Sequence, residues 1–100
     1  MKQAIVKLNN GTEYVFRNSN RTIMLFEEMA NKPIGEMDGF KDSLIWLYCT
    51  LKGCNRHEFT LEFDDFIDLL DENPQLRTEF VKFNLSLETS EPETKKKVKA

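Results

Sequence analysis

The sequence contains few of the residues from which catalytic centres, metal sites and disulfide-stapled domains are built. Among 100 residues there are one histidine, two cysteines and four glycines. Both cysteines, Cys49 and Cys54, fall in one predicted helix at a spacing that puts them on different faces. A disulfide between them would require that helix to break, so we expect two free thiols in a reducing compartment.

Net positive charge and long apolar runs are also missing. The formal net charge is -3 at pH 7, which leaves no broad basic surface to neutralise nucleic-acid phosphates. The longest apolar-rich stretch, residues 44–51, is far below the roughly 18 to 20 residues that span a bilayer. Residues 1–8 alternate apolar and polar side chains, whereas a signal peptide needs a continuous apolar region. We therefore expect a soluble, cytoplasmic protein with neither a nucleic-acid nor a membrane partner.

The groups that could carry out catalysis stand isolated. His57 and Cys54 could act as base and nucleophile, but no third group is evident to orient them. A zinc site built from Cys49, Cys54 and His57 would match no recurrent ligand spacing and would lack a fourth ligand. We expect no catalytic, cofactor-binding or metal-binding residues and predict that the protein is not an enzyme. A small enzyme or metal protein that uses Cys54 and His57 is the least favoured alternative.

What the sequence does contain is apolar periodicity, first at the period of a strand. Ala4, Val6 and Leu8 alternate with other residues, and the alternation resumes over residues 13–17. Asn10-Gly11 lies between the two runs, and both residues tolerate a positive φ, which makes this pair a strong hairpin signal. The pattern predicts a β-hairpin over residues 3–17.

From there to residue 87, apolar side chains recur at spacings of three and four, the period of a helix. The pattern predicts four helices, over residues of about 21–31, 40–54, 61–72 and 74–87. The N-cap of the first is expected among residues 18–20, and that of the last at Asn73, with Pro74 at the first helical position. Acidic side chains between residues 62 and 71 are interpreted as the solvated face of the third helix rather than as a cation site.

These elements predict one mostly α-helical domain of the α+β class over residues 1–87, with an N-terminal β-hairpin followed by a bundle of about four helices. A chain of 100 residues is one domain's worth. Residues 88–100 contain one large apolar side chain, Val98. Its burial cannot offset a backbone entropy of roughly 1 to 2 kcal/mol per ordered residue, so we expect a disordered, charged tail.

The helix at 40–54 and the many aromatic side chains point to a protein partner. Beside its main apolar stripe this helix carries a second, uncharged stripe, so it is either central to the domain or half of it meets a partner. Eight phenylalanines and four methionines are difficult to bury in so small a domain, and exposed apolar patches mark binding surfaces. The candidate partner-binding residues are Met24, Met29, Trp46, Cys49, Thr50 and Phe59.

Three helical segments together carry a resemblance to a known family. They are TIMLFEEMANKPI at residues 22–34, DSLIWLYCTLK at 42–52 and FDDFIDLLDENP at 63–74. The first is a hydrophobic-Phe-Glu-Glu-hydrophobic helix before a Lys-Pro stop, the second has the form Leu-x-x-Leu-Tyr-x-x-Leu, and the third is acidic and ends in Asp-Glu-Asn-Pro. In order and character, residues 13–83 resemble the tail assembly chaperones of long-tailed bacteriophages and prophages.

The resemblance implies a multi-copy protein without an active site or cofactor, which coats the hydrophobic tape measure protein before tail tube subunits polymerise around it. The implied partners are the tape measure protein and, as a second candidate, the tail tube protein. It also implies a homo-oligomer that works in the host cell cytoplasm. The alternative is a small regulatory or adaptor protein that binds a toxin or a repressor.

Overall fold

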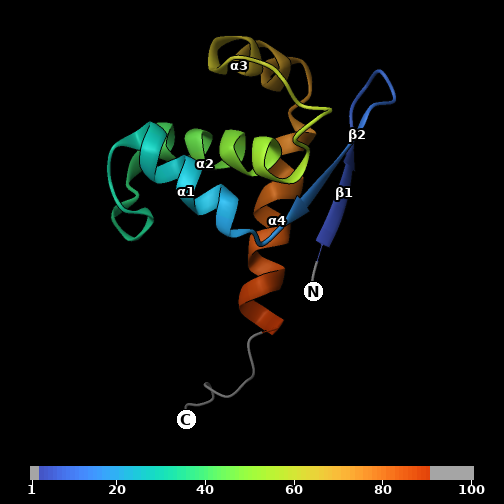
Figure 1. Cartoon of the computed structure of the whole chain (residues 1–100). Coiled ribbons are helices and arrows are strands. Elements are labelled where there is room, and N and C mark those ends of the chain that lie inside the picture. Colours follow the sequence, from blue (N-terminus) through green and yellow to red (C-terminus); the bar gives the residue numbers. More distant parts are fainter. Residues whose placement is uncertain (1–2, 91–100) are drawn as a thin grey trace.

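The computed structural model describes residues 3–90, and the side chains of residues 3–85. Among these residues, a two-stranded antiparallel hairpin precedes four helices, which confirms the predicted fold class (Figure 1). A short 3-10 turn, η1, separates the first two helices. The elements are β1 (Gln3–Lys7), β2 (Glu13–Arg17), α1 (Asn20–Ala30), η1 (Ile34–Glu36), α2 (Gly39–Cys54), α3 (Phe63–Glu72) and α4 (Gln75–Ser90).

The hairpin forms where the alternation predicts it. At its turn the backbone N–H of Leu8 donates to the carbonyl of Thr12 at 2.7 Å. Gly11 takes a φ of 94° there, a value that glycine adopts without steric cost. One face of the hairpin is turned into the core, and its buried residues are Val6, Leu8, Tyr14 and Phe16.

α1 is bounded by the local signals that its sequence carries. The Ser19 side chain accepts a hydrogen bond from the backbone N–H of Arg21 at 3.2 Å and so caps the helix. The helix ends at Ala30, and Asn31 takes the left-handed conformation two residues before Pro33. Both ends agree with the prediction for the first helix.

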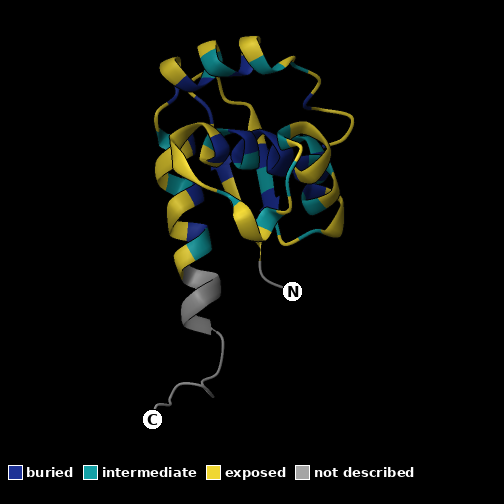
Figure 2. Cartoon of the chain, turned by 90° about the vertical axis from the view of Figure 1, so that its left-hand side faces the viewer, coloured by how far each residue is buried: buried dark blue, intermediate teal, exposed yellow. Residues whose placement is uncertain are grey.

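α2 is the central helix of the fold. It packs against α1, against β2 and, through Trp46, against Phe80 of α4. Eight of its 16 residues are buried and its exposed residues lie in its first five positions, whereas α3 shows mainly exposed residues on its outer side (Figure 2). The sequence allowed α2 to be either central to the domain or half in contact with a partner. From Asp42 onward the helix is largely buried, so this part of it is central.

The junction between α3 and α4 differs in detail from the prediction. Asn73 and Pro74 separate the helices as predicted, and α4 begins at Gln75, directly after Pro74. Among the described residues, however, the Asn73 side chain makes no capping hydrogen bond to the backbone of α4. The Asn73 amide nitrogen donates to the carbonyl of Leu69 at 2.9 Å, and its amide oxygen accepts from the backbone N–H of Asn9 at 2.8 Å. A long-range contact with the hairpin turn therefore takes the oxygen that a cap would use.

The hydrophobic core joins the hairpin to the helices. The Phe16 ring of β2 lies 5.3 Å from the Phe80 ring and 5.9 Å from the Phe83 ring of α4, measured between ring centroids. α4 continues to Ser90, three residues past its predicted end at 87, while residues 91–100 of the predicted tail lie outside the described residues. Within residues 3–90 no helix is long and apolar enough to cross a membrane.

Candidate protein-binding surface

The six predicted partner-binding residues separate into surface and core positions. Met24 and Met29 are exposed on α1, and Trp46 is half-buried on α2. The other three side chains have at most 2% of their surface exposed. No partner reaches them in the folded chain, so their prediction as binding residues is wrong. These three core residues are Cys49, Thr50 and Phe59.

Elements distant in the sequence cover this part of α2 and the loop after it. The Phe59 ring lies edge-on to Tyr14 of β2 at 5.4 Å and to Tyr48 of α2 at 5.6 Å, measured between ring centroids. Burial raises the pKa of the Cys49 thiol to about 12, against a smaller lowering by the Lys52 ammonium. The thiol therefore behaves as a small apolar group of the core.

The structure directs Cys54 toward the hairpin. Its Sγ atom accepts from the backbone N–H of Arg17 at 3.3 Å and donates to the carbonyl of Arg17 at 3.4 Å. His57 is exposed in the loop that follows α2. Over residues 3–90 there is no group of three or more histidine, cysteine or acidic side chains that could hold a metal ion.

An apolar groove opens where α2, α3 and α4 meet. Its volume is about 620 Å³. Phe40 at the start of α2 is 60% exposed, and Val81 of α4 is 52% exposed, so two large apolar side chains reach solvent at this place. The apolar residues that line the groove are Phe40, Leu44, Ile67, Leu70, Pro74 and Val81.

The groove continues along α2 and α4 into a second hollow of about 220 Å³. Phe40, Leu44 and Val81 line both hollows, so they form one continuous surface. Trp46 and Leu85 also line the second hollow. The centroid of the Trp46 ring lies 5.0 Å from that of the Phe80 ring, and Leu85 is exposed. We call the two hollows together the α2–α4 groove.

Charges of both signs border the α2–α4 groove. The Arg77 guanidinium lies 4.8 Å from the centroid of the Phe40 ring, within the range of a cation–π interaction. Lys82 contributes a second positive charge from α4, and Asp71 contributes a negative charge from α3. The lining thus suits a segment that is apolar along its centre and charged at its edges.

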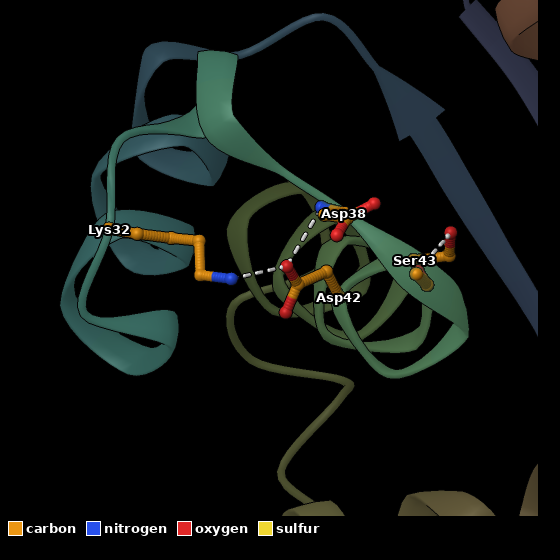
Figure 3. A network of polar contacts seen from close by, with 5 residues as sticks. Lys32, Asp38, Asp42 and Ser43 are labelled. Atoms are coloured by element: carbon orange, nitrogen blue, oxygen red, sulfur yellow. Dashed lines mark hydrogen bonds and ion pairs between the residues drawn. The ribbon is translucent and has the colours of Figure 1, made fainter.

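A partly buried ion pair lies at the start of α2, from which Phe40 projects. Lys32 Nζ lies 2.8 Å from Asp42 Oδ2, and the same oxygen accepts from the backbone N–H of Asp38 at 2.9 Å (Figure 3). These two hydrogen bonds, that of Lys32 first, lower the pKa of Asp42, while the bond with Asp42 raises the pKa of Lys32. A carboxylate in the first turn also interacts favourably with the helix dipole.

Comparison with known proteins adds no relative. No family model, no curated protein and no solved structure matches the chain.

Of the residues that line the α2–α4 groove, only Trp46 is among the predicted partner-binding residues. The predicted partner-binding residues include neither Phe40 nor Val81, which are exposed in the groove. The available signal was that Val81 falls outside the row formed by Leu76, Phe80 and Phe83. An apolar side chain beside a complete core row has no place in the core, which is a reason to expect it at the surface.

Proposed function

We propose that this chain is a non-catalytic, protein-binding chaperone of phage tail assembly, which shields a hydrophobic helical segment of a tape measure protein. The observation that carries the proposal is the α2–α4 groove, an exposed apolar surface that runs along two helices. Exposed apolar side chains that gather along a groove are candidates for contact with a partner.

A helix is the form of partner that suits the groove. An amphipathic helix lays its apolar face into a hydrophobic groove and leaves its charged flanks at the rim. Phe40, Val81 and Leu85 offer exposed apolar contacts along the groove, with Arg77, Lys82 and Asp71 at its edges. Met24 and Met29 on α1 add flexible apolar side chains on a separate surface.

The identity of the client follows from the resemblance of residues 13–83 to tail assembly chaperones. The resemblance implies a protein that coats the long, hydrophobic tape measure protein before tail tube subunits polymerise around it. Many copies of a small protein with an apolar groove would suit that role in the host cytoplasm. The tail tube protein is the second candidate partner.

The test is co-expression of the full chain with the tape measure segment encoded in its gene neighbourhood, followed by co-purification. We expect the parent chain to keep the client soluble and Val81→Glu to reduce its recovery roughly tenfold or more, because a charge would be placed in an apolar contact. Val81→Leu is the matched control and should retain binding. Both variants should have a free energy of unfolding close to that of the parent, because the Val81 side chain is half exposed.

Two outcomes would count against the proposal. If Val81→Glu recovers the client as well as the parent does, the groove is not the binding surface. If the neighbouring genes encode a toxin or a repressor and that protein co-purifies with the chain, the adaptor alternative is supported in place of the chaperone.

A further inference from the structure

The two outer edges of the hairpin differ in how many of their backbone groups are hydrogen-bonded to other described residues. Along β2, Asn55 fills the edge: its amide oxygen accepts from the N–H of Val15 at 2.9 Å, and its amide nitrogen donates to the carbonyl of Val15 at 3.0 Å. Cys54 does the same for both backbone groups of Arg17. Side chains of the α2 end therefore act as a substitute strand for β2.

The bonds to Val15 also fix which way the backbone of β1 faces. Ile5 is the register partner of Val15, and in an antiparallel pair the two opposed residues either bond to each other or both face away. Because the backbone groups of Val15 face Asn55, those of Ile5 face out from the other edge of the hairpin. The backbone N–H and carbonyl groups of Gln3 and Lys7, two residues away on either side, face outward as well.

The outward groups of β1 are largely without partners among the described residues. The carbonyl of Lys7 accepts from the side-chain amide of Gln75 at 3.2 Å. The N–H and carbonyl of Ile5 have no hydrogen bond to any described residue. The Ile5 side chain is 59% exposed as well, on the face opposite the core. An open edge that carries an exposed apolar side chain is a template for another strand.

We propose that a second copy of this chain occupies this edge, with the two β1 strands paired antiparallel about a two-fold axis at Ile5. Because the N–H and carbonyl of Ile5 both face outward, Ile5 of one copy can exchange two hydrogen bonds with Ile5 of the other. Gln3 then lies opposite Lys7 of the second copy. The result is a four-stranded sheet whose outermost strands are the two β2 strands, each already covered by its own Asn55 and Cys54.

Self-pairing fits the side chains of β1 as well as its backbone. A two-fold at Ile5 packs the two exposed isoleucines against each other and places each lysine opposite a neutral glutamine, so no like charges are opposed. β1 contributes no residue to the lining of the α2–α4 groove. The dimer therefore leaves both grooves open and does not depend on the proposed client.

The first measurement is the mass of the full chain in solution by sedimentation over a range of concentrations. We expect a dimer at high concentration for the parent and a monomer for Ile5→Lys, which would set two ammonium groups against each other at the axis. Met24→Lys is the matched control, since it also replaces an exposed apolar side chain by lysine, but on α1. Its dimer should persist.

Cross-linking tests the register even if Ile5→Lys folds poorly. Two Ile5→Cys chains would have their Cα atoms about 5.5 Å apart in a hydrogen-bonded pair, within disulfide range. Two Gln3→Cys chains would be about 14 Å apart at a rise of about 3.4 Å per residue. Under mild oxidation we expect covalent dimers from Ile5→Cys and none above the parent background from Gln3→Cys.

The proposal is overturned by a parent chain that stays monomeric at all concentrations, or by an Ile5→Lys variant that dimerises as the parent does. It is also overturned if Gln3→Cys cross-links as readily as Ile5→Cys. A dimer that fails to form while the client still binds through Val81 would leave the chaperone proposal intact, so the two proposals fail separately.

Discussion

Gly53 of α2 lies against Thr22 of α1 at a point with no room for a side chain. A Cβ atom at this position would be 2.9 Å from Thr22 Oγ1 and 3.2 Å from the Thr22 backbone nitrogen. The hydroxyl of Thr22 is buried there without a hydrogen-bond partner among the described residues. The close approach of the two helices thus depends on a missing methyl group.

Gly53→Ala should therefore destabilise the chain even though alanine is the better helix former. Overpacking costs about 1 to 3 kcal/mol, whereas alanine gains about 0.8 to 1.0 kcal/mol over glycine in a helix. Backbone atoms of Thr22 cannot rotate away, so we expect a net loss of about 1 kcal/mol in the free energy of unfolding, measured by urea denaturation. Gly35→Ala is the control, because a Cβ there meets nothing within 4 Å. A gain in stability at position 53 would contradict this packing.

At the scale of elements, the start of α2 depends on an ionised pair. Asp42 is 8% exposed and bonded to Lys32, and its pKa is lowered first by that hydrogen bond and then by the N–H of Asp38. A lowered carboxyl pKa contributes stability above the ordinary pKa of about 4, and this is lost as the pH falls through the lower folded value. The raised pKa of Lys32 contributes below about 10.4, and this is lost only as the pH rises through the higher folded value.

Asp42→Asn should accordingly lower stability at neutral pH and much less in acid. Asparagine can still accept from the Asp38 N–H, but it cannot pair with the Lys32 ammonium. We expect the urea midpoint of the variant to lie below that of the parent at pH 7, with the difference closing below about pH 4. Asp68→Asn, on the exposed face of α3, is the control, and its urea midpoint should match that of the parent at each pH. A difference that stays constant from pH 7 to acid would show that charge is not the cause.

For the whole molecule, Cys49 reports on global unfolding. Its thiol is buried and its pKa is raised to about 12, first by burial. At pH 8 the thiolate would be about one part in ten thousand, and the thiolate is the form that reacts. Access requires that the core open, so modification should follow the unfolded fraction of the chain.

Alkylation should therefore modify Cys49 slowly in the native chain and fast in urea. Mass spectrometry of the labelled peptide measures both rates, and Cys49→Ala identifies the contribution of Cys54. We expect the native rate at Cys49 to rise with urea in parallel with unfolding. Labelling of Cys49 in the native chain at the rate found in urea would contradict its place in the core.

Most element positions could be read from local patterns, because hairpin turns and helix ends depend on neighbouring residues. The Asn10-Gly11 turn and the Ser19 cap are interactions within a few residues, and both lie where the sequence predicts them. The exception is Asn73. Its side chain was predicted to cap α4, but it bonds to Asn9 and Leu69 instead. A contact between positions 9 and 73 leaves no trace in local periodicity.

The sequence by itself therefore determined a hairpin, four helices and the scarcity of catalytic groups. Only the tertiary structure decided which apolar side chains are core and which are surface. Cys49, Thr50 and Phe59 were expected at a partner surface and lie in the core, whereas Phe40 and Val81 are exposed. The physical reason is that periodicity identifies the apolar face of a segment, but burial depends on what packs against that face. Here the covering elements come from distant parts of the chain, and they leave the α2–α4 groove open.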